Sequence, residues 1–166
     1  MLFFSRIHYK KGLDRLIEAC ALLSARGVKH QLVIAGTGDG DYPQQMESLV
    51  ERRGIQDTTT FVGFVTGRTK VALLAASDVF ALATSQENFG FVYFESLAAG
   101  TPVLTTKGTD TWPELESSGG AVIADNTPEA FADALERLLP DREAMAAMGS
   151  AGRAWVLEYL STASIR

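Results

Sequence analysis

A cluster of basic side chains near the start of the chain could hold an anion. Its members, which lie between an apolar run and an amphipathic one, are Arg6, His8, Lys10 and Lys11. A helix that begins there would present N–H groups without partners and partial positive charge, which favour an anion. Arg6 offers a planar fork of donors and Lys11 a point charge, and this combination suits a diphosphate. A solvated basic turn that balances nearby acids explains the same residues equally well, and His8 taken alone indicates a surface residue.

Two glutamates further along the chain, Glu87 and Glu95, could hydrogen-bond a ligand from the two ends of one segment. Glu87 precedes an expected helix and would face a cleft, whereas Glu95 lies inside that helix among apolar residues. A carboxylate on so apolar a helix costs free energy unless a donor satisfies it. A ribose is one candidate, because a carboxylate accepts two hydrogen bonds side by side. The alternative is that Glu95 pairs with a basic side chain and Glu87 is solvated.

Glycines could let a ligand approach the backbone at two further points. Gly90 leaves space against the first N–H groups of the expected helix, which Asn88 or a neighbour is expected to cap. The segment Gly36–Gly40 is similar to nucleotide-binding glycine loops, but the third glycine of the dinucleotide fingerprint is not at its expected spacing. Taken alone, it is better explained as a turn between a strand and a helix. The chain has no glycine-rich loop ending in Gly-Lys-Ser or Gly-Lys-Thr, which disfavours a P-loop nucleoside triphosphatase.

An alternation of short apolar runs and amphipathic segments would position these residues. The runs are 1–4, 32–35, 60–62, 79–82, 102–105 and 121–124. Most of these runs are apolar throughout rather than alternating between apolar and polar residues, as in strands covered on both faces. Helices are predicted at 13–26, around 46–50, at 91–99, from 127 to 138 and at about 141–159, where Gly149 and Gly152 weaken the pattern.

This alternation predicts an α/β fold, a Rossmann-like, doubly wound and mostly parallel sheet of about six strands with helices on both faces. Ligands of such folds bind at the carboxyl ends of the strands, so the loops that follow the apolar runs are the candidate site.

Composition excludes several other classes. The chain has 166 residues, 46% of them hydrophobic and 21% charged, which predicts one packed domain over residues 1–166 rather than disorder. Cys20 is the only cysteine, so neither an intramolecular disulfide nor a cysteine-rich zinc site is possible. No apolar run has the length of a membrane span, and the first residues do not follow the order of a signal peptide. A net charge of −5 argues against a nucleic-acid polymer as partner. A cytoplasmic domain without bound metal is expected.

Six blocks in the same order resemble the C-terminal half of a retaining glycosyltransferase of the GT-B fold, of the group 1 or family 4 type. The resemblance covers nearly the whole chain. The blocks are Ser5–Gly12, Val33–Gly38, Phe61–Val65, Ala76–Val79, the pair Glu87 and Glu95 with seven residues between them, and Ala99–Val103.

The resemblance implies catalytic roles for three of the residues named above. Arg6 and Lys11 would hold the donor diphosphate and offset the charge that builds on it as the sugar–phosphate bond breaks. Glu87 would face the donor sugar, orient its hydroxyls and stabilise positive charge at the anomeric centre. Glu95 would bind the ribose hydroxyls. Further donor contacts are implied at Gly38, Gly63, Phe64, Val65, Asn88, Phe89, Gly90 and Phe91. The resemblance implies no metal and no cofactor, with a nucleoside-diphosphate sugar as substrate.

The chain departs from the family pattern at two positions. Asn88 stands where a small residue or proline is more usual, which could alter sugar preference. The loop from Thr105 to Glu114 is a variant of a glycine-pair loop, and Glu114 is interpreted as structural rather than catalytic.

The resemblance also implies a missing half. The sequence is expected to start inside its first strand, as a domain excised from a longer chain would, and the N-terminal acceptor domain of the GT-B fold is expected to lie outside it. That domain or a companion chain would complete the active site, and any peripheral membrane association would come through it. The expected function is therefore the donor-binding half of a hexosyltransferase, which binds donor but transfers little alone. A sugar-nucleotide epimerase of the same architecture and a non-catalytic nucleotide-binding or assembly module are the alternatives.

Overall fold

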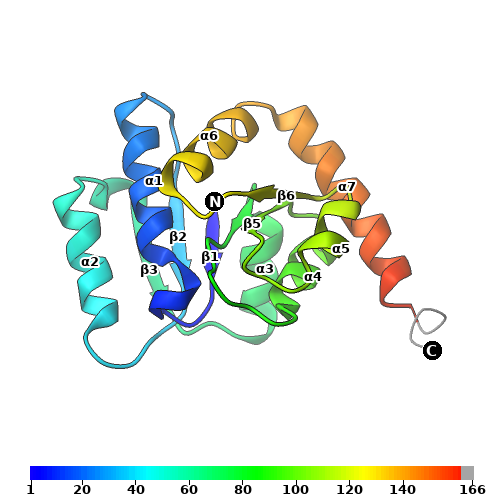
Figure 1. Cartoon of the computed structure of the whole chain (residues 1–166), viewed down its shortest axis with the longest axis horizontal. Helices are drawn as coiled ribbons and strands as arrows, with labels where there is room; N and C mark the ends of the chain where they lie inside the picture. The colour runs from blue at the N-terminus through cyan, green and yellow to red at the C-terminus, as the bar shows by residue number, and fades with distance from the viewer. Residues whose placement is uncertain (162–166) are drawn as a thin grey trace.

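Six parallel strands form one sheet, in the order β3-β2-β1-β4-β5-β6, in the computed structural model, which describes residues 1–161 (Figure 1). The strands are β1 Leu2–Phe4, β2 Leu32–Ala35, β3 Thr59–Gly63, β4 Phe80–Ala81, β5 Val103–Thr106 and β6 Ala121–Ala124. Each of the six predicted apolar runs contains or overlaps one of them. Strand order and parallel pairing are those of a Rossmann-like, doubly wound sheet, so the predicted fold class is confirmed.

Seven α-helices connect the strands or follow them within the described part of the chain. They are α1 Leu13–Ala25, α2 Tyr42–Arg52, α3 Gly67–Ala76, α4 Phe91–Ala98, α5 Trp112–Ser117, α6 Pro128–Leu138 and α7 Arg142–Tyr159. The five predicted helices are confirmed, with termini of the expected kind. Gly27 ends α1 with a φ of 72°, and the Thr127 hydroxyl accepts a hydrogen bond from the backbone N–H of Ala130 at the start of α6. None of these helices combines the length and the apolar character that crossing a bilayer requires.

Two helices, α3 and α5, were not predicted. In α3 only Leu74 is buried, so the helix has no apolar stripe that a periodicity argument could detect. α5 has six residues and opens with Trp112-Pro113, which is too short for a helical period to show.

The glycines that weakened the prediction of α7 prove to be contact points. A Cβ atom on Gly149 would lie 2.1 Å from the backbone oxygen of Gly100, and one on Gly152 would lie 2.7 Å from Leu97 Cδ2. Both distances are far below van der Waals contact, so only glycine lets α7 pack this closely on the end of α4. The helix therefore continues through both positions because packing against α4 outweighs their low helix propensity.

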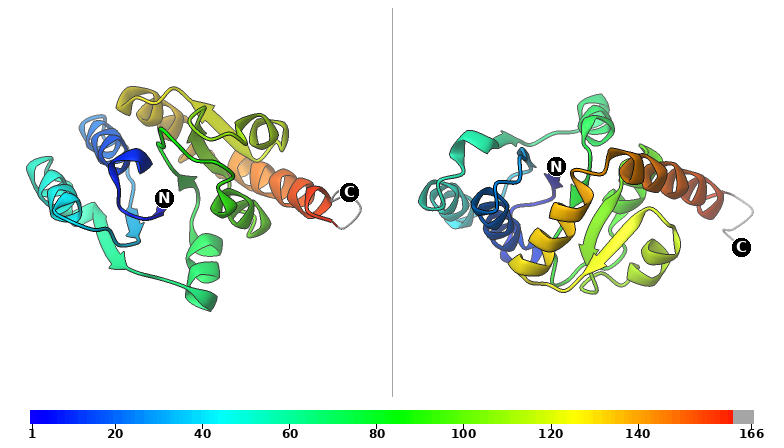
Figure 2. Two further views of the ribbon diagram at one scale, coloured as in Figure 1. Left: turned by 60° about the horizontal axis from the view of Figure 1, so that its bottom comes forward. Right: turned by 90° about the horizontal axis from the view of Figure 1, so that it is seen from above.

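The helices cover both faces of the sheet (Figures 1 and 2). One group consists of α1 with α2 and α6 packed against it, and a second group consists of α4 packed against α3 and α7. Trp155 of α7 stacks on Phe94 of α4 and on Tyr159. Trp155 therefore packs within the domain rather than projecting from it.

Strand order also brings distant loops together. β1 and β4 are neighbours at the centre of the sheet, although β2 and β3 separate them in sequence. The connections therefore run outward in opposite directions from this pair, and the crevice at the carboxyl ends of β1 and β4 is the topological switch point where such folds bind ligands. The segment with Arg6 and Lys11 follows β1, and the segment with Glu87 follows β4.

Candidate functional site

The loop after β1 turns sharply into α1 through a short 3₁₀ helix, Tyr9–Lys11. His8 caps this turn, because its Nδ1 accepts a hydrogen bond of 3.3 Å from the backbone N–H of Lys10. Gly12 follows with a φ of 69°, and a Cβ atom there would lie 1.8 Å from the backbone oxygen of Ala83. A side chain at position 12 is therefore excluded, and the start of α1 lies directly against the end of β4.

The loop after β4 is held by the loop that follows β5. The backbone N–H of Glu87 donates to the oxygen of Gly108 at 2.9 Å, and that of Asp110 donates to the oxygen of Glu87 at 3.0 Å. These two bonds extend the pairing of β4 with β5 beyond the sheet and fix the backbone of Glu87. α4 then begins after Gly90, which is its N-cap residue and has a φ of 67°, so the cap is a neighbour of Asn88 and not Asn88 itself.

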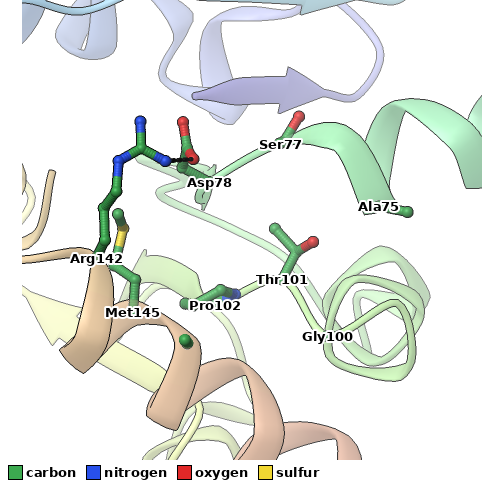
Figure 3. A pocket seen from close by; sticks show the side chains of 9 residues that line it. Ala75, Ser77, Asp78, Gly100, Thr101, Pro102, Arg142 and Met145 are labelled. Carbon is green, nitrogen blue, oxygen red and sulfur yellow. Dashed lines mark ion pairs between the residues drawn. The ribbon is translucent and has the colours of Figure 1, made fainter.

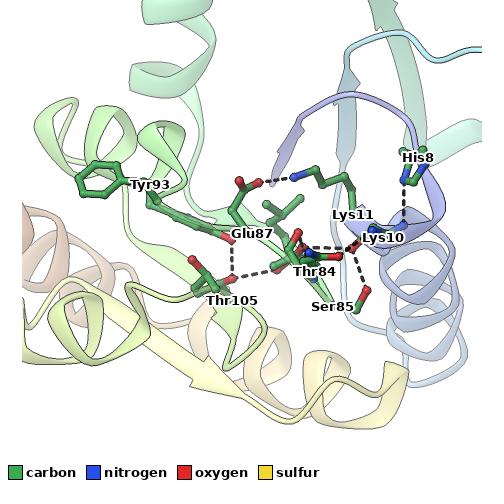
Figure 4. A network of polar contacts seen from close by, with 12 residues as sticks. His8, Lys10, Lys11, Thr84, Ser85, Glu87, Tyr93 and Thr105 are labelled. Atoms are coloured by element: carbon green, nitrogen blue, oxygen red, sulfur yellow. Dashed lines mark hydrogen bonds and ion pairs between the residues drawn. The ribbon is translucent and has the colours of Figure 1, made fainter.

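Two side chains of the first loop contact two of the second (Figure 4). Lys11 Nζ forms an ion pair and hydrogen bond with Glu87 Oε2, and Lys10 Nζ donates to Gln86 Oε1 at 2.7 Å. These residues line a cavity of about 200 Å³, whose walls are Arg6, His8, Lys10, Lys11, Gln86, Glu87 and Asn88. The structure thus brings together the three residues predicted to be catalytic, Arg6, Lys11 and Glu87.

A second cavity of about 280 Å³ adjoins the first, and its walls are mainly apolar. Phe4, Ser5, Arg6, Gly36, Thr37, Phe64 and Val65 line it. Arg6 is common to both cavities. One wall is Phe64, whose side chain is 76% exposed. One cavity is therefore polar and lined with cations, the other is apolar, and Arg6 contributes to the lining of both.

Glu95 pairs with a basic side chain, which was the alternative to a role in ribose binding. Both of its carboxylate oxygens contact Lys70 Nζ of α3, at 2.7 and 2.6 Å. Lys70 Nζ also lies 5.3 Å from the ring centroid of Phe4, which lines the apolar cavity. Glu95 is therefore satisfied by a basic side chain, and it lines a separate cavity between α3 and α4 with Lys70 and Leu74 rather than either of the two cavities above.

The remaining predicted residues surround these cavities or support them. Phe89 stacks on Phe94 with ring centroids 4.6 Å apart, and Phe91, at the start of α4, is 73% exposed. Gly63 ends β3 with a φ of 73° and is followed by Phe64. Gly38 packs on the first loop, because a Cβ atom there would lie 2.1 Å from the backbone oxygen of Ile7.

Tyr93 supports the second loop from below. Its ring lies under Gly90, where an added Cβ atom would come within 2.4 Å of it. Its hydroxyl is buried 2.9 Å from Thr105 Oγ1. Burial raises the pKa of Tyr93 far above its ordinary value, so this side chain stays neutral and serves as a rigid support.

Sequence reasoning missed two contributors to the site, Gln86 and Lys70, and it named Lys10 and Gly36 in their loops without assigning either a site role. Lys10 and Gln86 neighbour predicted residues in sequence, which was the available signal. Gly36 has a φ of 140° and lines the apolar cavity, whereas the sequence argument favoured Gly38 in the same loop. Lys70 lies on α3, and because that helix was not predicted, nothing indicated that Lys70 would approach Glu95.

Two further features lie outside these cavities. A cavity of about 190 Å³ lies at the amino ends of β4 and β5. It contains the ion pair of Asp78 and Arg142 and is bordered by Thr101 (Figure 3). Glu114 Oε2 is buried and has no hydrogen-bond partner among the described residues. Among residues 1–161, no group of three or more histidine, cysteine, aspartate or glutamate side chains is arranged to hold a metal ion.

Comparison with known proteins places the chain in a family. The sequence model of the "Glycosyl transferases group 1" family matches residues 1–155. A mannosyltransferase of Mycobacterium tuberculosis, the GDP-mannose-dependent alpha-(1-6)-phosphatidylinositol dimannoside mannosyltransferase, is 36% identical over 140 residues. This match covers 82% of the chain but only 35% of the mannosyltransferase, so the chain spans about a third of that relative's length.

Solved structures share the fold. The Anabaena protein HepE, crystallised with UDP, superposes with a TM-score of 0.87 at 22% identity, over 99% of this chain and 45% of HepE. The C-terminal domain of the group 1 glycosyl transferase LpcC from Francisella tularensis gives a TM-score of 0.83 at 24% identity, over 97% of this chain and 85% of that domain. At these identities the likeness concerns the fold, and it matches the fold of an isolated C-terminal domain.

Proposed function

The chain belongs to the group 1 glycosyl transferases, and from that premise we propose that it is the donor-binding half of a retaining enzyme that transfers a hexosyl group from a nucleoside-diphosphate sugar. One observation carries the proposal: Arg6 lines both an apolar cavity and a cavity lined with cations. A nucleoside diphosphate has the same two parts, a flat base and a dianionic diphosphate, joined by a ribose. The GDP-mannose named for the mannosyltransferase and the UDP bound to HepE are ligands of this class.

The diphosphate would lie in the polar cavity. Arg6 and Lys11 supply the cations, and the approach of α1 to β4 at Gly12 keeps them at the switch point. Negative charge grows on the leaving diphosphate as the anomeric C–O bond breaks, and fixed cations stabilise that charge more than they stabilise the intact donor. Arg6 and Lys11 would therefore act as the groups that favour departure of the diphosphate, without a metal ion or a cofactor in this role.

The sugar would lie beside Glu87, at the end of the diphosphate away from the base. The two bonds to the loop after β5 fix the backbone of Glu87, and Lys11 holds its carboxylate before a ligand arrives. A fixed carboxylate near the anomeric carbon stabilises the positive charge that develops there. The backbone at Asn88, Phe89, Gly90 and Phe91 would contact the sugar and the adjacent phosphate.

The base would lie in the apolar cavity, with Gly63, Phe64 and Val65 on one side. Phe64 presents an exposed ring that a base could stack on. Glu95 would accept hydrogen bonds from the ribose hydroxyls, in a ribose position that reaches its carboxylate beside Lys70.

A partner domain would complete the active site. Three exposed aromatic residues lie at the carboxyl ends of the strands, as the two cavities do: Tyr9 after β1, Phe64 after β3, and Phe91 at the start of α4. An N-terminal acceptor domain or a companion chain would cover these strand ends and supply the acceptor site, and it would carry any contact with a membrane. The chain alone is then expected to bind donor and transfer poorly. A cytoplasmic location remains part of this proposal.

Calorimetric titration of the chain with UDP, GDP and their sugar derivatives tests the proposal. The expected result is binding of at least one of them, with Arg6→Ala and Lys11→Ala each costing on the order of 1.5–3 kcal/mol because each removes a charge-assisted contact. Arg53→Ala is the matched control, since Arg53 pairs with Glu18 and lines neither cavity. Unchanged affinity in both variants would remove the phosphate site. Conversion of a sugar nucleotide without acceptor would instead favour the epimerase.

A further inference from the structure

Thr84 lies between the two charged loops and is fully buried. It follows the end of β4 and precedes the loop that carries Glu87 (Figure 4). Its main-chain oxygen accepts hydrogen bonds from Thr106 Oγ1 at 2.5 Å and from Asn126 Nδ2 at 3.2 Å. These bonds anchor the residue to the strands beside it, so its hydroxyl has a fixed position.

The Thr84 hydroxyl contacts the first loop at the residue before Lys11. Thr84 Oγ1 lies 3.0 Å from the backbone oxygen of Lys10, and the same oxygen also accepts from the N–H and the hydroxyl of Ser85, at 2.8 and 3.2 Å. The carbonyl of Lys10 is thus held entirely by the loop after β4. The carbonyl carbon of Lys10 is bonded to the nitrogen of Lys11, so this contact helps to fix the backbone of Lys11.

The same hydroxyl contacts the second loop at the residue before Glu87. Thr84 Oγ1 lies 3.1 Å from the backbone oxygen of Gln86 and accepts a hydrogen bond of 3.2 Å from the Gln86 N–H. A hydroxyl has one proton to donate, so it bonds to one of the two carbonyls at a time while it accepts from Gln86. One buried side-chain oxygen therefore joins the neighbours of both members of the Lys11–Glu87 ion pair.

We propose that Thr84 is a positioning residue of the donor site: its hydroxyl holds the Lys11 loop and the Glu87 loop in register. This inference rests on the proposed function. Valine has nearly the shape of threonine but no hydroxyl, so Thr84→Val would leave the Gln86 N–H without its partner in a buried place and weaken the hold on the Lys10 carbonyl. Serine keeps the hydroxyl, so Thr84→Ser would preserve the bridge.

The test compares these two variants with a matched control at the amino end of β5, away from both cavities. Thr101 is buried and its hydroxyl donates to the backbone oxygen of Leu74 at 2.6 Å, so Thr101→Val also deletes one buried hydroxyl–carbonyl bond (Figure 3). Amide hydrogen exchange is measured on the free chain, together with calorimetric affinities for UDP, GDP, uridine and guanosine and the melting temperature of each variant.

Thr84→Val is expected to speed amide exchange at Lys11, Ser85 and Gln86. It should also weaken binding of the nucleoside diphosphate about tenfold, a factor that corresponds to the net free energy of one hydrogen bond. Nucleoside affinity should stay within about twofold, and Thr84→Ser should behave like the wild type. Thr101→Val should lower the melting temperature without either effect.

The proposal would be overturned if Thr84→Val had the amide exchange rates and the nucleoside-diphosphate affinity of the wild type. Equal losses for nucleoside and diphosphate would overturn it too, since these would indicate general destabilisation. Failure of the wild-type chain to bind UDP or GDP would instead refute the proposed function, and the exchange rates would still decide whether Thr84 holds the two loops together.

Discussion

Lys11 and Glu87 are 76 positions apart in the sequence, and their side chains form an ion pair across the switch point of the sheet. Both side chains are largely buried, with exposures of 17% and 22%. In the free chain the carboxylate of Glu87 is thus paired with the ammonium group of Lys11, the cation that the proposed function assigns to the diphosphate. A diphosphate that binds Lys11 must compete with Glu87.

This competition predicts that Glu87→Gln binds a bare diphosphate more tightly than the wild type. The amide keeps the size of the side chain but removes the negative charge, so Lys11 becomes available to the ligand. A partly buried pair of this kind contributes about 1 kcal/mol, which corresponds to roughly fivefold in affinity. Titration with pyrophosphate measures it, and Glu18→Gln, which alters the pair with Arg53, is the control. Weaker binding in Glu87→Gln would mean that Glu87 supports anion binding. Transfer by the complete enzyme should nevertheless fall, because the charge facing the sugar is lost.

The fold could be predicted from the sequence because its strands are short, continuous apolar runs and most of its helices have an apolar stripe with a recognisable end. Gly27 and Thr127 mark such ends through local backbone geometry, which depends only on neighbouring residues. α3 escaped prediction because it buries a single residue, Leu74, so its sequence has no apolar stripe. Gly149 and Gly152 were misleading for the opposite reason, since their role depends on close contacts with Gly100 and Leu97, which are far away in the sequence.

The charged site could be predicted in part. Arg6, Lys11 and Glu87 follow two strands that a doubly wound sheet places side by side, so topology alone brings them near one another. The pairing of Lys70 with Glu95 depends on the position of α3, which no local pattern gave. The contacts of Thr84 likewise depend on the distance between two loops, and hydroxyl groups give no signal of their own in a sequence.

Gly90→Ala should destabilise the chain more than Gly27→Ala does. Both glycines have a positive φ, of 67° and 72°, so both substitutions impose the backbone strain of about 1–2 kcal/mol that an L-residue incurs there. A Cβ atom at position 27 meets nothing within 4 Å, whereas one at position 90 would clash with the Tyr93 ring and approach Glu87 Cγ at 3.1 Å. The clash should add about 1–3 kcal/mol.

Chemical denaturation of the two variants measures this difference directly. Equal losses of the free energy of unfolding would show that the Tyr93 ring moves aside without cost. Gly90→Ala should also weaken donor binding because it displaces Glu87, and Gly27→Ala should leave donor binding unchanged.

Cys20 should be unreactive in the folded chain. It lies on α1 with no exposed surface, and burial raises the pKa of its thiol from 9.0 to about 12. The thiolate is the reactive form, so a disulfide reagent at pH 8 should modify the unfolded chain within minutes and the folded chain only at the rate of unfolding. The folded state favours the neutral thiol, so Cys20 should also lower the free energy of unfolding as the pH rises from 9 towards 12. Rapid modification of the folded chain at pH 8 would contradict the burial of Cys20, and Cys20→Ala provides the blank.

Glu95→Gln should weaken binding of a nucleoside diphosphate while leaving pyrophosphate binding unchanged. Under the proposed function Glu95 accepts hydrogen bonds from the two ribose hydroxyls, and pyrophosphate has no ribose. The neutral amide would lose a charge-assisted contact, which is expected to cost about 1.5–3 kcal/mol. Lys70 holds Glu95 in the free chain, so Lys70→Met tests the same site from the other side: it frees the carboxylate but removes the side chain that fixes it. Titration of both variants with UDP, GDP and pyrophosphate separates the possibilities. Equal losses for nucleotide and pyrophosphate in Glu95→Gln would assign Glu95 a structural role, in which its pair with Lys70 joins α3 to α4 and the ribose is bound elsewhere.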